Sequence, residues 1–332
     1  MAREWASGLN VSRWAKELFK EVGKKIYFKK FMGDSMESMV VEKSMPEGKG
    51  KDMTFGLVGL TGTVVTGDSS LEGNEDGLSS YSQTVTSSQR RFGVINAGNF
   101  DDSKVLYSFR NEALSQLSRV YAEDVDSQIF SAATATSGTF GNVLAVDGDA
   151  STYSNSDQAG SLVAAGAIQL SDITRLKTIA TIGGSANWRM RPIRIGGEDH
   201  YVLIVHPEVA YDLFELSAWK TIQQYANVRG SDNPLFKGAL GVYSNVIIHS
   251  HQDITTSDTM GSGSNIKGAR NLFMGAGALA FARAGEMKWV EKSFDYANKL
   301  GVSAGWIYGV ARTAFNSKDY ACIQYISART DV

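Results

Sequence analysis

The chain has 332 residues, of which 43% are hydrophobic and 20% are charged, and its formal net charge is -2 at pH 7. This composition is ordinary for a globular protein and excludes the apolar-poor, highly charged class of disordered chains. The charge balance gives no overall basic field of the kind that indicates a nucleic-acid-binding protein, although a local basic face is compatible with it. Cys322 is the only cysteine, so an internal disulfide is excluded.

The hydropathy pattern indicates neither a membrane span nor a secretion signal. The longest apolar run starts at Leu272 and is shorter than the roughly 20 residues that cross a bilayer. The N-terminus lacks the apolar segment of a signal peptide. We therefore expect a soluble protein made in the cytoplasm, with no membrane partner.

The first part of the chain predicts a basic amphipathic helix. Apolar residues that include Trp14 and Leu18 recur at helical spacing, and Lys16 to Lys30 holds six lysines against two glutamates. Two interpretations stay open: a solvated helix face, or a detached arm that grips a partner chain.

Two runs with strand propensity, from about Met53 to Val65 and from Tyr81 onward, flank the acidic segment SLEGNEDGL at 70–78. The second run carries polar residues that are predicted to leave neither face of a strand apolar. We expect a hairpin that buries no face in its own core. Because an isolated hairpin is marginal in water, it needs support from elsewhere.

The strongest local prediction is a long helix over about 103–131, on the order of 40 Å in length. Its apolar stripe recurs at helical spacing. The stripe consists of Leu106, Phe109, Ala113, Leu117, Val120, Tyr121, Val125 and Ile129.

The remaining chain alternates strands and helices. Residues 131–166, rich in small and polar types, predict a long connection with a domain boundary. Later segments are interpreted as follows: a helix from near Ser171, strands at 191–195 and 200–207, a helix after Pro207, one strand at 242–251, a flexible loop at 253–265, one buried strand at 271–281, and strand patterns from Lys288 to Ile326, such as those at 306–315 and 320–326.

Motifs for chemistry are weak throughout. A calcium loop starting at Asp68 would need a glutamate at its twelfth position, where Ser79 stands. GVSAG at 301–305 matches a nucleophile elbow, but no histidine follows His251 to complete a triad after Ser303. We interpret it as a glycine-rich strand.

Two further motifs also favour structure over chemistry. GAGALA at 275–280 imitates a dinucleotide fingerprint but lacks the β-α-β context. His249 and His251 could hold a metal, yet a third ligand is missing, so we prefer a polar strand end. The sequence predicts no catalytic residue, cofactor or metal; a hydrolase using Ser303 and a soluble oligomeric binding protein remain alternatives.

Four motifs in order carry a family resemblance. They are VTGDSSLEGNEDGL at 65–78, YVLIVHPEVAYDL at 201–213 followed by Trp219, NPLFKGALGVYSNVIIHSH at 233–251, and LFMGAGALA at 272–280. Together the set resembles the major capsid proteins of tailed phages, specifically the coat-protein family typified by N4-like phages, with the HK97-like fold. The likeness extends from about Phe31 to Tyr325.

The resemblance implies an α+β fold with four parts. These are an N-terminal arm at 1–50, an extended β-hairpin loop at 51–98, a peripheral domain with a long spine helix at 99–164 and 266–332, and an axial domain at 165–265. The implied function is a structural one without enzymatic activity. Copies of the chain assemble as hexamers and pentamers into the icosahedral head shell that encloses a double-stranded DNA genome.

The resemblance also implies where copies meet. SLEGNEDGL becomes the tip of the projecting hairpin, with Glu72, Gly73, Glu75 and Asp76 facing a neighbouring subunit. Further expected interface residues are Trp14, Leu18, Lys24, Lys25, Arg90 and Arg91. A separate scaffolding protein, a portal and non-specifically held DNA are the other expected partners, and the expected location is the virion, after assembly in the host cytoplasm.

Overall fold

The computed structural model describes residues 26–45, 51–59, 62, 64–68, 70–73, 75–96, 98, 109–134, 142–146, 149–154, 159–183, 188–225, 239–285 and 288–330. The predicted N-terminal helix, with Trp14, Leu18, Lys24 and Lys25, lies outside these residues. Within the described ranges, no helix has both the length and the apolar composition to cross a bilayer.

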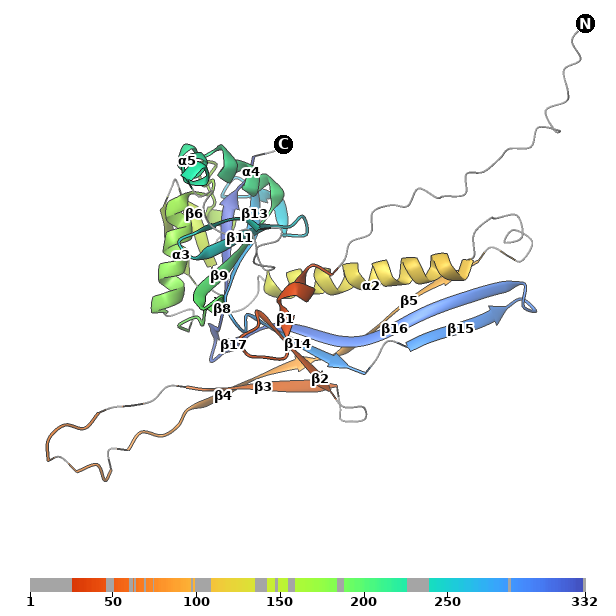
Figure 1. Ribbon diagram of the computed structural model, residues 1–332, viewed down its shortest axis with the longest axis horizontal. Coiled ribbons are helices and arrows are strands. Elements are labelled where there is room, and N and C mark those ends of the chain that lie inside the picture. The colour runs from red at the N-terminus through yellow and green to blue at the C-terminus, as the bar shows by residue number, and fades with distance from the viewer. Residues whose placement is uncertain are drawn as a thin grey trace, which may run out of the picture. The chain divides into compact units, whose positions relative to one another are not determined.

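Strands outnumber helices in the described chain (Figure 1). The helices are α2 Phe109–Ala133, α3 Leu170–Ile182, α4 Pro207–Glu215 and α5 Ser217–Tyr225, with 3-10 turns at Phe28–Phe31 and Ala159–Ser161. The strands are β1 Met32–Gly33, β2 Val40–Met45, β3 Asp52–Val58, β4 Ser80–Thr86, β5 Ser88–Ile95, β6 Asn142–Val146, β7 Asp149–Ser154, β8 Ile193–Ile195, β9 Glu198–Val205, β10 Ala239–Tyr243, β11 Val246–Ser250, β12 Thr256–Met260, β13 Ile266–Met274, β14 Leu279–Ala284, β15 Lys288–Phe294, β16 Lys299–Arg312, β17 Ala314–Phe315, β18 Lys318–Asp319 and β19 Cys322–Ala328.

The chain divides into two compact units. Unit 1 contains Arg91–Glu123 and Trp289–Ala304, whereas unit 2 contains Ile26–Arg90, Asp124–Lys288 and Gly305–Val332. Four elements, α2, β5, β15 and β16, contribute residues to both units.

A nine-stranded mixed sheet forms one core of unit 2. Its order is β10-β11-β9-β13-β19-β6-β7, with β12 paired to β13 and β8 paired to β9. Successive residues Val202–Val205 of β9 are at most 1% exposed, so both faces of this strand are covered. Apolar side chains of α3 and α4 are buried completely, among them Ile173, Leu176, Val209 and Leu213. The predicted helices near Ser171 and after Pro207 are confirmed.

The second large sheet has six strands in the order β1-β2-β14-β16-β15, with β5 also paired to β16. β2 joins β14 in parallel, and β14 lies antiparallel to β16. The segment 275–278 connects β13 of one sheet to β14 of the other, and Gly277 adopts a φ of +72° there. The prediction of one strand over 271–281 is therefore wrong, because a turn that requires glycine divides it.

β3 and β4 form the predicted hairpin, with Asp52 opposite Thr86 and Val58 opposite Ser80. The expectation that neither face is apolar is wrong. Tyr81 and Val85 alternate with polar residues and lie on one face with Phe55 and its neighbours. Phe55 and Val85 are 7% and 1% exposed in a cluster with residues of β2 and β14, so the base of the hairpin is packed in unit 2.

The long helix is confirmed as α2, which ends two residues beyond the predicted boundary. Residues 103–108, where the prediction placed its first turns, lie outside the described ranges. Four members of the predicted stripe, Ala113, Leu117, Val125 and Ile129, are at most 1% exposed, as the helical spacing requires.

Three other predictions are wrong because β pairing overrode weak local signals. The connection at 131–166 contains β6 and β7, and the loop at 253–265 contains β12, which pairs with β13. The strand at 242–251 is a hairpin of β10 and β11, because Ser244 and Asn245 both take positive φ values in a two-residue turn.

Candidate assembly surfaces

The far end of the β3–β4 hairpin is a turn that is held by local hydrogen bonds (Figure 1). Gly59 donates a backbone hydrogen bond to Ser79 at 2.8 Å, where the two-stranded ladder ends. Beyond it, Gly73 has a φ of +86°, and its amide donates to the Glu75 carboxylate at 2.8 Å. The Glu72 amide donates to the Ser70 hydroxyl at 3.2 Å. The acidic segment therefore forms a turn with local side-chain to backbone bonds.

This hairpin tip, defined as the described residues from Val58 to Leu78, exposes both carboxylates and apolar side chains. Glu72, Glu75 and Asp76 are exposed. Four large apolar residues are exposed with them: Val58 at 65%, Val64 at 83%, Leu71 at 60% and Leu78 at 82%. A surface that combines exposed apolar groups with charge is typical of an interaction site.

A second exposed surface lies on β5, β15 and β16, the strands of the six-stranded sheet that contribute residues to unit 1. A Cβ on Gly301 would lie 2.7 Å from the Phe294 ring, and a Cβ on Gly93 would lie 3.5 Å from the Ser303 Cβ, so these residues share a face. Strand alternation adds further residues of β5, β15 and β16 to that face. We call it the basic face, and its members are Arg91, Gly93, Ile95, Val290, Lys292, Phe294, Lys299, Gly301 and Ser303.

The basic face is cationic and partly apolar. None of its nine residues is acidic, and Arg91, Lys292 and Lys299 carry positive charge. Ile95 is 55% exposed and Val290 is 59% exposed. The Phe294 ring lies against Gly301, where there is no side chain to displace it, and it adds apolar surface to the face.

The opposite side of the same sheet differs in chemistry. Val302 and Ala304 of β16 are buried, with at most 1% exposure. The Glu291 carboxylate accepts hydrogen bonds from Arg110 of α2 and from the Trp289 indole. The hydrogen bond from Arg110 lowers the pKa of Glu291 most, and the bond from Trp289 lowers it further. The acidic residue of β15 is thus paired on the side away from the basic face.

The two arginines predicted for an interface lie in different environments. Arg90 forms an ion pair with Asp124 at 3.0 Å in unit 2. The same carboxylate accepts from the Trp306 indole at 3.0 Å and the Tyr308 hydroxyl at 2.7 Å. Arg91 is exposed on the basic face. Of the pair, Arg91 is therefore the better placed for contact with another copy.

Ser303 lacks the geometry of a nucleophile elbow. It lies inside the continuous strand β16, and its hydroxyl donates to the Phe92 carbonyl at 3.2 Å. An elbow requires a sharp strand-to-helix turn, so the hydrolase alternative is contradicted and the glycine-rich strand is confirmed. GAGALA likewise leads into β14 rather than a helix, which removes the dinucleotide interpretation.

The histidine pair lies at the end of β11, where the His251 ring accepts a hydrogen bond from the Asp253 amide at 3.2 Å, and it also belongs to an aromatic cluster. The Tyr27 ring lies 4.3 Å from the His251 ring and 6.4 Å from the His249 ring, between centroids. His249 is fully buried, because β11 packs its side chain against the 3-10 turn at Phe28–Phe31. In the part of the chain that is described, no three His, Cys, Asp or Glu side chains gather as a metal site would need.

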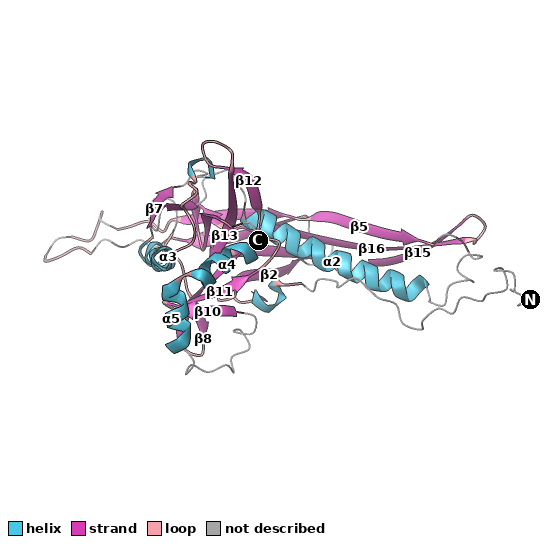
Figure 2. Ribbon diagram, turned by 90° about the horizontal axis from the view of Figure 1, so that it is seen from above, coloured by secondary structure: helices cyan, strands magenta, loops and turns pink. Residues whose placement is uncertain are grey.

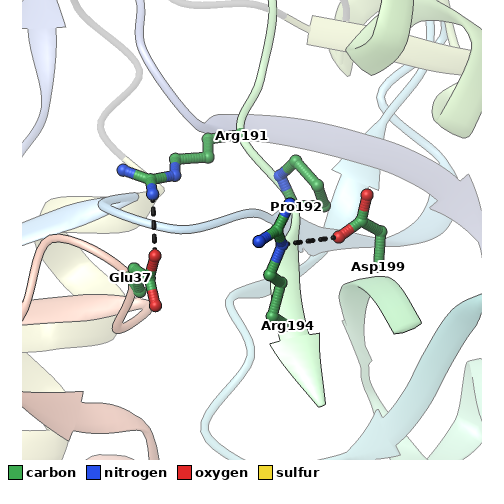
Figure 3. Close-up of a pocket in the computed structure, with 5 residues that line it drawn as sticks. All are labelled: Glu37, Arg191, Pro192, Arg194 and Asp199. Atoms are coloured by element: carbon green, nitrogen blue, oxygen red, sulfur yellow. Dashed lines mark hydrogen bonds and ion pairs between the residues drawn. The ribbon is translucent and has the colours of Figure 1, made fainter. Parts of the chain in front are cut away.

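A polar pocket of about 200 Å³ lies in unit 2 (Figure 3). Arg191 pairs with Glu37 at 2.8 Å, and Arg194 pairs with Asp199 at 3.3 Å. Each guanidinium that lines the pocket is thus already neutralised by a carboxylate, and the arrangement offers no unbalanced charge for a ligand.

The comparisons with known proteins agree with one another. The model of the phage capsid protein family matches residues 4–327. The major capsid protein of Pseudomonas phage KPP25 is 25% identical, over 95% of this chain and 94% of that protein. The capsid protein of Ralstonia phage GP4 superposes with a TM-score of 0.78 at 27% identity, covering 100% of this chain and 99% of the other. The capsid protein of cyanophage Pam1 gives a TM-score of 0.82 at 20% identity, with 99% of each chain covered.

The fold is therefore the HK97-like fold of tailed-phage coats, in an α+β chain with a projecting hairpin. The chain belongs to the phage capsid protein family. Its function is structural: it is a major capsid protein, a component of the head shell.

Sequence reasoning found the hairpin tip but missed most of the basic face. Val290, Lys292, Phe294 and Lys299 were read only as parts of strands. Their alternation in KWVEKSF, with charged and apolar residues on both faces, is a signal of a strand that is exposed on both sides. The pairing that brings β5 beside β16 has no local signal (Figure 2).

Proposed function

We propose that copies of this chain assemble as hexamers and pentamers into an icosahedral shell, and that the hairpin tip of one copy docks on the basic face of the next. The observation that carries the proposal is the complementarity of these two exposed surfaces. One offers Glu72, Glu75 and Asp76 among apolar side chains, and the other offers Arg91, Lys292 and Lys299 among apolar side chains.

The contact is heterologous, because one surface meets a different surface of the next copy. Such contacts generate closed rings when the rotation between copies closes. Repetition of the same contact is what a shell of many identical subunits requires, so a small number of residues serves every capsomer.

The apolar groups supply most of the affinity. Full burial of a leucine-sized side chain contributes about 1.5–3 kcal/mol, whereas an exposed ion pair contributes about 0–1 kcal/mol. Leu71 and Leu78 on the tip, against Val290 and Phe294, therefore dominate the stability of the contact. The charges set its register and its rate of formation, and they make assembly sensitive to salt.

We also propose partners and a location for the assembled coat. The role is containment without catalysis, in a virion assembled in the host cytoplasm. A separate scaffolding protein and a portal accompany the coat, and double-stranded DNA is held without sequence reading. Trp14, Leu18, Lys24 and Lys25 of the N-terminal arm, and Arg90 of β5, remain predicted contacts with a neighbour.

Charge reversal with a compensating swap tests the docking. The tip variant carries Glu72→Lys, Glu75→Lys and Asp76→Lys, and the face variant carries Arg91→Glu, Lys292→Glu and Lys299→Glu. Each is co-expressed with candidate scaffolding proteins, as is the unaltered chain, and shells are counted by sedimentation velocity and negative-stain electron microscopy.

We expect hollow shells from the unaltered chain and a loss of at least about tenfold in shell yield for each single-surface variant, with the circular dichroism of the subunit unchanged. A chain that carries both sets regains shells, because the charges are exchanged rather than removed. Unchanged yield in the tip variant, or no recovery in the combined variant, would contradict the docking.

A further inference from the structure

Gln83 of β4 makes a pair of hydrogen bonds that no other residue of the hairpin reproduces among the described contacts. Its side-chain amide nitrogen donates to the Arg312 carbonyl at 2.6 Å. Its amide oxygen accepts from the Ala314 backbone amide at 2.6 Å. A carbonyl and an amide two residues apart on one strand edge are the groups that a neighbouring strand would pair with. The Gln83 side chain therefore takes the place of a strand at the end of β16.

The backbone that receives Gln83 is itself held firmly. The Arg312 guanidinium is buried and donates to the Asp319 carboxylate at 2.6 Å, to the Ala133 carbonyl at 2.9 Å and to the Cys322 carbonyl at 2.7 Å. The Thr313 hydroxyl donates to the Gly277 carbonyl at 2.6 Å. Gln83 thus connects the hairpin to a rigid part of unit 2.

Packing contacts at the base of the hairpin are of a different kind, and a further side-chain hydrogen bond there, from the Ser87 hydroxyl to the Ala282 carbonyl, is long at 3.5 Å. Phe55 and Val85 pack in an apolar cluster, and apolar contact is non-directional. Thr86 lies close to Gly309: a Cβ on Gly309 would stand 2.3 Å from the Thr86 carbonyl oxygen. This contact limits how close β4 and β16 come, but it does not fix the angle between them. Two short hydrogen bonds from one planar amide are directional, so they fix the angle.

We propose that Gln83 is the positioning residue that sets the direction in which the hairpin leaves unit 2, and hence where its tip meets the next copy. The inference rests on the proposed docking of the tip. Glu72 lies beyond the paired strands, 11 residues from Gln83 along the chain, at the end of a lever on the order of 35 Å if the intervening residues are extended. A small rotation at Gln83 therefore displaces the tip by many times the movement at the base.

Two substitutions separate the hydrogen bonds from the packing. Gln83→Glu keeps the shape and the acceptor for Ala314, but its carboxylate cannot donate to the Arg312 carbonyl. Gln83→Leu removes both bonds and keeps most of the volume. Gln89→Glu, at an exposed position of β5, is the matched control for the added charge.

The first readout is hydrogen exchange of the unassembled chain, corrected for intrinsic rates, at pH 7 and near pH 4.5. We expect about fivefold faster exchange at the Ala314 amide and in β3 and β4 for Gln83→Leu, which corresponds to loss of a hydrogen bond worth about 1 kcal/mol. Gln83→Glu exchanges faster at pH 7 and recovers in part near pH 4.5, because roughly 40% of a glutamate carboxyl of ordinary pKa is protonated there and can donate again. Gln89→Glu stays at the rate of the unaltered chain.

The second readout is the size and yield of shells. We expect Gln83→Leu to give fewer and irregular shells, although its subunit unfolds cooperatively. Unchanged exchange in both Gln83 variants would overturn the inference, and so would faster exchange with shells of normal size and yield. Failure of the unaltered chain to form shells would instead count against the proposed function, while the exchange data would still decide whether Gln83 holds the hairpin.

Discussion

At the scale of single residues, buried and half-buried polar side chains join elements that lie far apart in the sequence. Asp124 gathers Arg90, Trp306 and Tyr308 around one carboxylate, and Gln83 completes a strand edge with its amide. Each of these groups satisfies donors or acceptors that would otherwise be costly to bury. The sequence displays such residues but does not reveal their partners.

Cys322 gives a prediction about reactivity at this scale. Burial raises the pKa of its thiol from about 9 to about 11, against a smaller lowering by Arg312. At pH 8 the folded chain therefore holds only about 0.1% thiolate, the reactive form. We expect a thiol reagent at pH 8 to modify the native chain at least roughly 100-fold more slowly than the chain in urea, because the folded thiol is also fully buried.

The raised pKa of Cys322 also determines how the stability of the folded chain changes with pH. Between about pH 9 and pH 11 the unfolded thiol loses its proton while the folded thiol keeps it, so stability falls as pH rises through that window. A Cys322→Ser variant serves as the unlabelled control. Native modification at a rate near that of the unfolded chain would contradict the assigned burial.

At the scale of elements, α2 anchors the start of the described chain. The Asp126 carboxylate is fully buried and accepts the amides of Tyr27 at 2.6 Å and Phe28 at 3.3 Å. Burial raises the pKa of the Tyr27 phenol, and the negative charge of Asp126 raises it further. The phenol therefore stays neutral at physiological pH. The 3-10 turn at Phe28–Phe31 is therefore tied to the helix through one side chain.

We expect Asp126→Ala to lower the free energy of unfolding by about 2–4 kcal/mol, because two buried amides lose their acceptor. Asp126→Asn keeps one acceptor oxygen and costs roughly 1 kcal/mol. Urea unfolding measures both values, and trypsin cleavage after Lys29 or Lys30 reports release of the turn. Equal urea midpoints and equal cleavage rates for the unaltered chain and Asp126→Ala would show that the anchor is unimportant.

Elements with strong periodicity could be predicted from the sequence, and elements defined by pairing could not. The stripe of α2 and the apolar run of β9 are local signals, and both predictions are confirmed. The turn at Ser244 and Asn245 contains no glycine, so it was read as strand. The basic face joins residues near 93 with residues near 301, and only tertiary pairing brings them together.

At the scale of the whole molecule, the chain is a head-shell protein of the phage capsid family. Under the proposed docking, the two exposed surfaces leave each copy incomplete on its own. An acidic, apolar tip and a basic, apolar face on the same chain allow one kind of contact to be repeated around every capsomer.

The most direct test is interchain cross-linking between the two surfaces. One chain carries Glu75→Cys, a tagged second chain carries Lys292→Cys, and the two are co-assembled and oxidised. The native Cys322 is buried, so the introduced thiols are the ones that react. Each variant assembled alone is the control.

A disulfide requires Cβ atoms about 3.5–4.5 Å apart, so the bond reports close contact. The docking predicts tagged covalent heterodimers on a non-reducing gel of purified shells, and few homodimers in the controls. Shells that assemble normally and run as monomers after oxidation would contradict it.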